Sequence, residues 1–140
     1  MKYDIKIDKD GSKRYYVNKV LHRENGPAVE YPAIKYSVGT KQWYINGKLH
    51  RENGAAIEFA NGEKEWYKNG KLHREDGPAI EYANGTKCYI KNGLRHREDG
   101  PAVEWNDGYK EWWLNNKHYG SNNDFTNKSW KKFVKTLIFS

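Results

Sequence analysis

The sequence predicts an all-β protein: a solenoid-like stack of antiparallel β-hairpins, about five 23-residue repeats, closed by a short C-terminal α-helix. A recurring motif and a set of evenly spaced glycines predict the stack, and a C-terminal segment with helical periodicity predicts the helix. Repeats of about 20 to 50 residues are typical of solenoids and arrays, in which each copy packs only on its neighbours. We therefore expect residues 1–140 to form a single repeat domain.

The recurring motif is Leu-His-Arg-Glu-Asp-Gly-Pro-Ala, which starts at Leu72 and has related versions that start at Leu21, Leu49 and Arg95. A turn glycine aligns five copies, at Gly11, Gly39, Gly62, Gly85 and Gly108. A second turn, such as Asn69-Gly70, follows each of these glycines. The spacing is 23 residues except in the first full copy, which has five extra residues around positions 31–36.

Each copy has the pattern of one β-hairpin followed by a connector. Small or polar residues alternate with large apolar ones over residues 79–82, Asn84-Gly85 supplies two residues that tolerate positive φ, and residues 87–90 favour a strand. The connector ends at a proline such as Pro101, which cannot donate to a ladder and suits the start of a strand. A third strand would invert every second copy, so we predict two strands per copy.

The core is predicted to be thin and built from columns of equivalent residues. Only 36% of the residues are apolar, and many of these are Tyr or Trp, which suits a narrow core of flat rings. The first-strand residues expected inside are Val29, Ile57, Ile80 and Val103, followed two positions later by Tyr31, Phe59, Tyr82 and Trp105. The second strand adds the aromatic column Tyr15, Trp43, Trp66, Tyr89 and Trp112.

The two ends depart from the repeat. Residues 1–20 form a partial N-terminal copy, with alternating Ile5 and Ile7 as its first strand, and residues 21–120 hold the full repeats. Residues 121–140 are expected to form a capping helix, with Asp124 or Thr126 as its N-cap. Its apolar residues recur at helical spacing, at Trp130, Phe133, Val134, Leu137 and Ile138. Repeat arrays need such a cap at an open end.

The net charge of +7 is concentrated at the two ends of the chain. Residues 1–20 and residues 121–140 each carry a net +3, which leaves +1 for the hundred residues between them. Nucleic-acid binding would favour a continuous basic stripe along the repeats, so this distribution argues against it. A lone cysteine, Cys88, suits a reducing compartment, and neither a signal peptide nor an apolar run of about 20 residues is present. We therefore expect a cytoplasmic protein.

The combination of Tyr or Trp, then Asn-Gly, then Leu-His at a 23-residue hairpin period resembles the MORN-type repeat. The Leu-His-Arg-Glu-Asp-Gly-Pro-Ala version is similar to the YwqK-like antitoxin family and to repeat proteins of phages and giant viruses. The resemblance covers about residues 5–120. It implies a hairpin array that serves as a protein-interaction platform, in some cases with phospholipid, and a role as an antitoxin or accessory factor, in the host cytoplasm for a phage or viral protein.

The repeated His-Arg-Glu-Asp residues suggest several kinds of site. A catalytic centre is one irregular constellation, whereas these residues recur in four equivalent places, which favours a scaffold in which each arginine pairs with a carboxylate of the neighbouring copy. A ladder that binds a ligand is the alternative. A metal site at His22, His50, His73 and His96 is disfavoured because equivalent residues two strands apart lie about 9.5 Å from each other. The sequence thus predicts no catalytic residue, no metal and no cofactor.

Cys88 occupies a column that other copies fill with Arg14, Gln42, Glu65 and Glu111. We therefore expect it on the solvent side of the sheet. Neighbouring Lys87 and Lys91 leave a reactive thiol as the alternative.

We expect a non-enzymatic module that binds a protein partner through an exposed face of aromatic and arginine columns, as a phage, viral or bacterial inhibitor that occludes its target. The candidate partner-binding residues are Arg23, Arg51, Arg74, Arg97, Tyr44, Tyr67, Trp113, Tyr31, Tyr36, Lys131 and Lys132. The alternative is nucleic-acid or nucleotide binding through the His-Arg columns. Self-association into a homodimer through an end repeat, by way of the strand at Ile5 and Ile7, is compatible with either.

Overall fold

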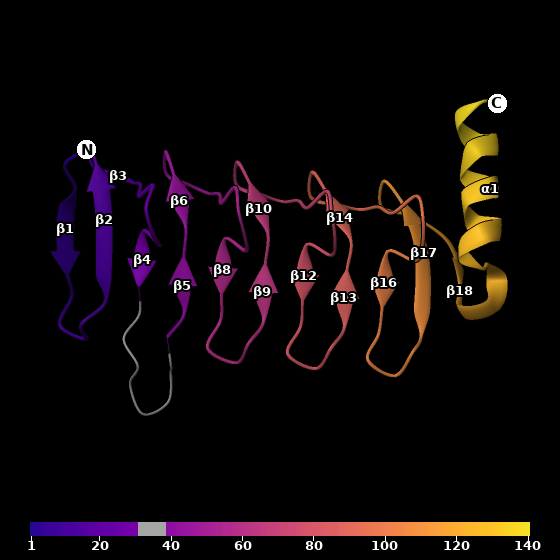
Figure 1. Ribbon diagram of the computed structural model, residues 1–140, viewed down its shortest axis with the longest axis horizontal. Coiled ribbons are helices and arrows are strands. Elements are labelled where there is room, and N and C mark those ends of the chain that lie inside the picture. The colour runs from indigo at the N-terminus through magenta and orange to yellow at the C-terminus, as the bar shows by residue number, and fades with distance from the viewer. Residues whose placement is uncertain (31–38) are drawn as a thin grey trace. The chain divides into compact units, whose positions relative to one another are not determined.

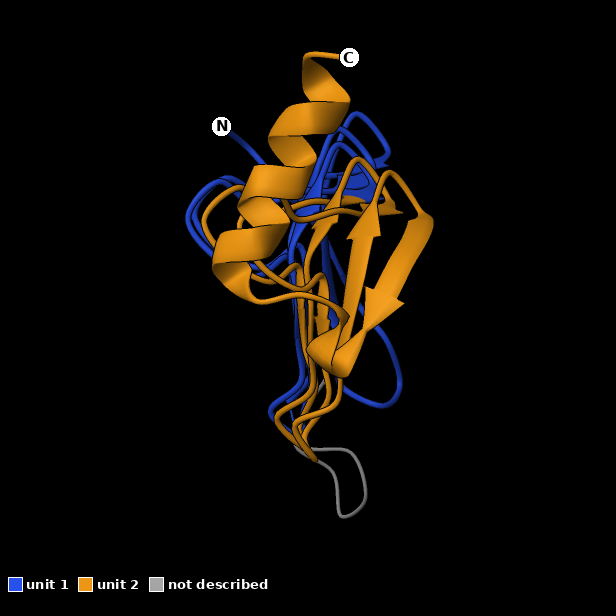
Figure 2. Ribbon diagram, turned by 90° about the vertical axis from the view of Figure 1, so that its right-hand side faces the viewer, with its two compact units in different colours: residues 1–71 blue, residues 72–140 orange. Residues whose placement is uncertain are grey.

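The computed structural model describes residues 1–30 and 39–140, and the chain forms two compact units, unit 1 (Met1–Lys71) and unit 2 (Leu72–Ser140) (Figures 1 and 2). Short antiparallel strands make up most of both units, and one α-helix follows the last strand of unit 2. The predicted fold class, stacked antiparallel hairpins with a C-terminal helix, is therefore confirmed. In the part of the chain that the structure describes, no helix is long and apolar enough to cross a membrane.

Unit 1 contains one main sheet with the strand order β1-β2-β4-β5-β8-β9. These strands are β1 (Asp4–Ile7), β2 (Lys13–Val17), β4 (Val29–Glu30), β5 (Lys41–Gln42), β8 (Ile57–Glu58) and β9 (Lys64–Glu65). Smaller strands lie off this path: β3 (Val20–Leu21), β6 (Tyr44–Ile45), β7 (Lys48–Leu49), β10 (Tyr67–Lys68) and β11 (Lys71–Leu72). β3 pairs with β2, and β6 pairs with β7.

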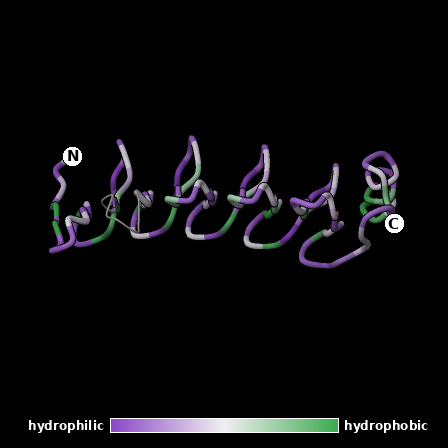
Figure 3. The backbone as a smooth tube through the Cα atoms, turned by 90° about the horizontal axis from the view of Figure 1, so that it is seen from below, coloured by the Kyte–Doolittle hydropathy of each residue, from purple (hydrophilic) through white to green (hydrophobic). Residues whose placement is uncertain are grey.

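Unit 2 repeats this arrangement with the strand order β12-β13-β16-β17-β18. These strands are β12 (Ile80–Glu81), β13 (Lys87–Cys88), β16 (Val103–Glu104), β17 (Lys110–Leu114) and β18 (Lys117–Ser121). A separate hairpin joins β14 (Ile90–Lys91) to β15 (Leu94–Arg95). The 3-10 helix η1 (Asn122–Asp124) and helix α1 (Asn127–Ile138) complete the unit. Along the chain, apolar segments alternate with hydrophilic turns (Figure 3).

Each full copy contains two hairpins, so the prediction of two strands and a connector was incomplete. In unit 2 the second strand is interrupted at Tyr89 and resumes as β14, which pairs with the connector strand β15. Asn92 and Gly93 form the turn with φ angles of 50° and 78°, the backbone that a two-residue hairpin with right-handed strand twist requires. Each hairpin reverses the chain direction, so two hairpins restore it, and the first strands of adjacent copies run in the same direction.

The inward column Val29, Ile57, Ile80 and Val103 is buried, as predicted. Cys88 pairs with both Ile80 and Val103, so these three side chains share one face of the unit 2 sheet. Side chains alternate along a strand, so Tyr89 lies on the opposite face. The expectation that the Trp/Tyr column packs beside the Val/Ile column was therefore wrong.

Two further expectations about the core were wrong in unit 2. Tyr82 and Trp105 are exposed, because each lies one residue beyond the end of its strand, beside a turn. Cys88 is buried rather than on the solvent side, in a cluster with Ile80, Ile90 and Val103. Burial raises the pKa of the Cys88 thiol, which disfavours the reactive thiolate form.

Helix α1 covers the aromatic face of the last hairpin in unit 2. Thr126 is its N-cap, one of the two predicted caps, and accepts a hydrogen bond from the Ser129 backbone N–H. Trp130 is fully buried and lies 5.5 Å from Trp112, measured between ring centroids. The Trp130 indole N–H donates to the Arg97 carbonyl oxygen at 2.9 Å. The helix thus closes the aromatic column at this end of unit 2.

Replacing Trp130 with Ala should lower the free energy of unfolding of unit 2 by about 3–5 kcal/mol, because a fully buried ring and its hydrogen bond are lost. Urea unfolding followed by tryptophan fluorescence and circular dichroism measures this change. Phe139→Ala is the matched control, since Phe139 is 85% exposed and should change stability by less than about 0.5 kcal/mol. Equal effects of the two substitutions would contradict the capping role of the helix.

Candidate functional site

The repeated arginines are held by partners that follow them in the same stretch of chain. Arg97 Nη1 donates to the Pro101 carbonyl oxygen at 3.1 Å and to Glu104 Oε1 at 2.9 Å. The same two contacts, to the carbonyl four residues on and the glutamate seven residues on, occur at Arg23, Arg51 and Arg74. The prediction that each arginine pairs with a carboxylate of a neighbouring copy was therefore wrong for these glutamates.

Each of three arginines also stacks on an aromatic ring eight residues before it. The guanidinium carbon lies 3.9 Å from the ring centroid of Tyr15 at Arg23, 3.8 Å from that of Trp43 at Arg51, and 3.8 Å from that of Tyr89 at Arg97. A planar guanidinium over an aromatic face contributes cation–π attraction and excludes water from the ring. The arginine columns are thus part of the packing of the aromatic face.

A glycine three residues after each arginine makes room for its guanidinium. A Cβ atom at Gly100 would lie 2.7 Å from Arg97 Cζ, and one at Gly77 would lie 2.8 Å from Arg74 Cζ. Gly26 and Gly54 stand in the same relation to their arginines. The glycine of the repeated motif is therefore explained by close approach of this side chain.

The repeated histidines hold the second turn of the following copy. His73 Nδ1 accepts the Asn92 backbone N–H at 2.9 Å, and His96 Nδ1 accepts that of Asn115 at 3.1 Å. His22 and His50 make the same contact with Asn46 and Asn69 in unit 1. An accepting Nδ1 places the proton on Nε2, which faces a glutamate two residues on, as in His73 to Glu75 at 2.6 Å. At His50, His73 and His96 the two ring nitrogens therefore hold the backbone and a carboxylate. Within the described residues, Nε2 of the buried His22 has no hydrogen-bond partner.

These contacts lower the pKa of several carboxyl groups. The hydrogen bond from His50 lowers the pKa of Glu52, and hydrogen bonds from His73 and then Lys91 lower that of Glu75. The hydrogen bond from Arg97 lowers the pKa of Asp99. All three groups are therefore more acidic than in the unfolded chain.

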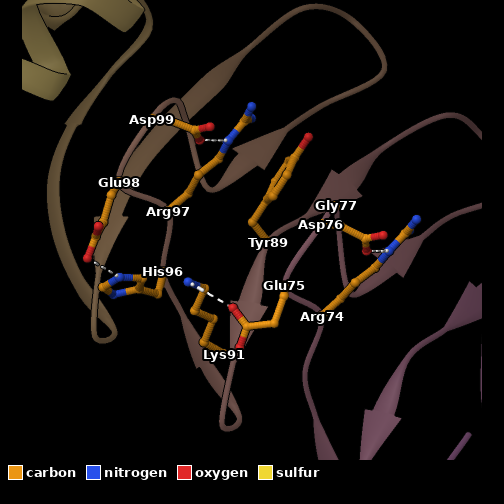
Figure 4. A pocket seen from close by; sticks show the side chains of 10 residues that line it. All are labelled: Arg74, Glu75, Asp76, Gly77, Tyr89, Lys91, His96, Arg97, Glu98 and Asp99. Atoms are coloured by element: carbon orange, nitrogen blue, oxygen red, sulfur yellow. Dashed lines mark hydrogen bonds and ion pairs between the residues drawn. The ribbon is translucent and has the colours of Figure 1, made fainter. Parts of the chain in front are cut away.

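A hollow of about 400 Å³ lies between two successive motif loops of unit 2 (Figure 4). Arg74 and Arg97 line it from the two loops, and Tyr89 lies between them. Arg74 Nε donates to Asp76 at 3.0 Å, and Arg97 Nε donates to Asp99 at 2.8 Å. In this hollow, the Nε–H of each guanidinium is therefore already hydrogen-bonded to an aspartate of the chain.

The equivalent hollow of unit 1, about 610 Å³, has different chemistry. Asn25 and Asn53 stand where unit 2 has aspartates, so two negative charges are absent from its lining. Among the residues that the structure describes, no carboxylate accepts from Nε of Arg23 or Arg51. Within the described residues, their Nε–H groups therefore lack the carboxylate partner that Arg74 and Arg97 have.

The predicted interface aromatics Tyr44, Tyr67 and Trp113 are half-buried, each with its polar atom directed at the residue two positions before it. The Tyr67 hydroxyl lies 2.9 Å from Glu65, and burial together with this carboxylate raises the pKa of Tyr67 to about 12. These side chains lie on the same sheet face as the Val/Ile column, since they are two residues beyond its cross-strand partners.

The remaining predicted partner-binding residues fall into two groups. Lys131 and Lys132 are exposed on helix α1. Tyr31 and Tyr36 lie outside the described residues.

A set of exposed aromatic residues near the hairpin turns of unit 2 was not predicted from the sequence. Tyr82, Trp105 and Tyr109 are 39%, 45% and 40% exposed. Tyr82 and Trp105 follow the buried Ile80 and Val103 by two residues and therefore lie on the same face as them. Their exposure could have been predicted from the adjacent Asn-Gly and Asp-Gly turns, because a residue next to a turn lies at the end of the strand pairing.

No protein-family model matches this sequence, and no curated protein matches it.

The contribution of Glu52, Glu75 and Asp99 to the free energy of unfolding should be constant above about pH 5 and fall as the pH is lowered through 4.5, the ordinary pKa of a glutamate. The carboxyl groups of Glu52, Glu75 and Asp99 have lower pKa values when folded, so in this range the unfolded chain binds more protons and acid favours it. Urea unfolding between about pH 7 and 3 measures the effect. A Glu52→Gln and Glu75→Gln variant should lose less stability, and an equal loss would contradict the assignment.

Proposed function

We propose that this chain is a non-enzymatic protein-binding repeat module, and that the exposed aromatic row of unit 2, Tyr82, Trp105 and Tyr109, forms part of its binding surface. The observation that carries the proposal is the exposure of these three rings at 39–45%. Tyrosine and tryptophan are enriched at the centres of protein interfaces, where they bury a large area at low entropic cost.

The geometry of the row suits a partner that contacts several rings at once. Tyr82 and Trp105 occupy equivalent positions of adjacent hairpins, two strands and therefore about 9.5 Å apart. The backbone N–H groups of both residues donate across their turns at 2.9 Å, and the Trp105 indole donates to Glu111 at 3.0 Å. A surface held in place before binding loses little conformational entropy on association.

The repeated polar residues support a scaffold rather than a catalytic centre. A catalytic centre concentrates mutually perturbed groups in one constellation. Here each of the four repeated arginines donates to the carbonyl oxygen four residues on and to the glutamate seven residues on, and each of the four histidines accepts a turn N–H through Nδ1. The predicted absence of enzymatic activity rests on this equivalence.

We propose that the module acts as an inhibitor, of the antitoxin or anti-defence type, which covers the working surface of a protein partner in a bacterial or host cytoplasm. The resemblance of the motif to MORN-type repeats, YwqK-like antitoxins and phage or giant-virus repeat proteins supports this role. A preformed aromatic row is suited to occlusion, because the inhibitor needs no rearrangement to bind.

Replacing Tyr82 and Trp105 together with Ser should abolish capture of a partner protein from a bacterial lysate at about 0.3 M salt, since central interface aromatics each contribute about 2 kcal/mol or more. Capture by the immobilised chain after nuclease treatment, followed by mass spectrometry, identifies the partner, and calorimetry then measures its affinity. Phe139→Ser, which removes an 85% exposed ring just after helix α1, is the control and should retain the partner. Unchanged affinity in the double variant would refute the aromatic row.

Nucleic-acid or nucleotide binding is the second candidate. It is favoured by the Nε–H groups of Arg23 and Arg51, which lack a carboxylate partner within the described residues. A phosphate oxygen could take the place that aspartate holds in the hollow of unit 2. Contacts of this kind weaken steeply between about 50 and 200 mM salt, whereas aromatic burial does not.

The substitutions Asn25→Asp and Asn53→Asp test this candidate, because they supply unit 1 with the carboxylates that unit 2 already has. Binding of a labelled single-stranded oligonucleotide, measured by fluorescence anisotropy at about 50 mM salt, should weaken at least about ten-fold while the fold is retained. The same substitutions should leave protein capture unchanged. Oligonucleotide binding that is absent in the wild type, or equal in the variant, would exclude this site.

A further inference from the structure

Strand β1 ends the strand order of unit 1 and leaves one edge of its sheet without a partner in the described part of the chain. All four of its residues are exposed, and Ile5 and Ile7 are 56% and 63% exposed. An exposed edge with apolar side chains is a template for pairing with another strand.

The hydrogen bonds of strand β2 show which β1 backbone groups face outward. The Tyr15 N–H donates to the Ala28 carbonyl oxygen, on the side of β2 away from β1. Backbone groups alternate sides along an antiparallel strand, so Arg14 and Tyr16 face β1, where they pair with Lys6 and Asp4.

The residues between these hydrogen-bonded positions of β1 have the opposite orientation. The N–H and C=O groups of Ile5 and Ile7 therefore point away from β2, and Tyr3 continues the alternation just before the strand. Asp8, whose N–H donates to the Ser12 carbonyl oxygen, belongs to the inward set. A strand added to this edge must bond to Tyr3, Ile5 and Ile7.

The charges of β1 and its flanking residues match those of a second, antiparallel copy of the same strand. With Ile5 opposite Ile5 of the other copy, Asp4 lies opposite Lys6. In the same register Lys2 lies opposite Asp8, and Tyr3 opposite Ile7. Opposite charges directly across an antiparallel pair stabilise it, as do paired apolar side chains.

The two neighbouring registers that the outward backbone groups allow are unfavourable. Shifting the centre to Asp4 places Asp4 opposite Asp4 and Lys2 opposite Lys6. Shifting the centre to Lys6 places Lys6 opposite Lys6 and Asp4 opposite Asp8. Like charges directly opposite each other are destabilising, so the sequence selects the register centred on Ile5.

We infer that the chain forms a two-fold symmetric homodimer in which the β1 strands of two copies pair antiparallel, centred on Ile5. The partner is a second copy of this chain, and the sheet of unit 1 continues from one copy into the other. Side chains alternate along a strand, so Tyr3, Ile5 and Ile7 lie on one face of the sheet. This is the face of Tyr15, which is the cross-strand partner of Ile5 and whose ring contacts Tyr3 edge-on. In the dimer these residues of both copies share that face. Two-fold pairing closes at two copies, because it uses the free edge of each.

Charge reversal at the two central positions tests the dimer. Sedimentation velocity from about 1 to 500 µM should show a reversible monomer–dimer equilibrium for the wild-type chain. Asp4→Lys creates two Lys–Lys pairs in the dimer and Lys6→Asp creates two Asp–Asp pairs, so each variant alone should dissociate at least about ten-fold more readily. An equimolar mixture of the two variants should recover the wild-type affinity, since every pair is then complementary.

Two further variants separate register from general charge effects and from misfolding. Lys132→Asp makes the same charge change on exposed helix α1 and should leave the dimer unaffected. Asp4→Lys combined with Lys6→Asp in one chain restores complementary pairs and should dimerise like the wild type. Circular dichroism confirms the fold of each variant. The carboxylate introduced by Lys6→Asp would face Arg14 across the ladder, so the fold should tolerate this substitution.

A wild-type chain that stays monomeric up to about 500 µM would overturn the inference. A dimer whose affinity is unchanged by either single reversal would do so as well, as would variants that fail to associate when mixed. None of these outcomes depends on the aromatic row of unit 2, so the dimer and the proposed protein-binding function are tested separately.

Discussion

The stacking of arginine on the aromatic ring eight residues before it is the interaction on which the rest of the structure depends. A thin sheet has two faces, and the Val/Ile column fills only one of them. On the other face the guanidinium covers the ring and is fixed by a carbonyl oxygen and a glutamate, as at Arg97. Arginine suits this position because its flat, delocalised group can stack and donate several hydrogen bonds at once. A chain with little aliphatic material can thereby exclude water from both sides of the sheet.

The histidines extend this local packing from one copy to the next. Each holds the turn asparagine of the following copy through Nδ1, and the turn glycine beside it bonds back to the preceding connector, as Gly93 does to the Leu72 carbonyl oxygen at 2.8 Å. Stability in such an array depends on nearest-neighbour contacts. The motif that looks most like a catalytic set is therefore better explained as the joint between copies.

The sequence was sufficient to predict what depends on local rules. The Asn-Gly turns set the copy frame because their backbone requires positive φ, and Thr126 was predicted as a helix cap because its hydroxyl can satisfy a free N–H. The sequence was not sufficient to predict which face of the sheet each column occupies. The second strand is interrupted at residues such as Tyr89, so the alternation of residue types does not show which column packs beside which. The arginine cover also depends on contacts that spacing alone does not specify.

Cys88 shows how neighbouring columns determine burial. In the copies that contain Tyr67 or Trp113, the aromatic polar atom hydrogen-bonds to a glutamate two residues before it, so that position is polar. In the copy with Cys88, Ile90 stands in place of the aromatic residue. A glutamate at position 88 would therefore have no hydroxyl or indole N–H to bind, and Cys88 instead completes an apolar cluster. The column that contains Cys88, considered alone, therefore predicted the wrong side of the sheet for this residue. Considered together with the column that contains Ile90, it explains why Cys88 is buried.

The last hairpin of unit 2 also shows how the array can change length. Gly120 stands where the earlier copies have arginine, and Trp130 of helix α1 covers Trp112 in its place. A Cβ at Gly120 would lie 2.9 Å from Asp124, so the substitution also admits the chain that leads into the helix. Among the described residues, the helix packs on Trp112 and on no earlier member of the aromatic column, so a change in the number of interior copies would leave the contacts of this terminus intact. Variation in copy number would then change the extent of the surface offered to a partner while each local contact stays the same.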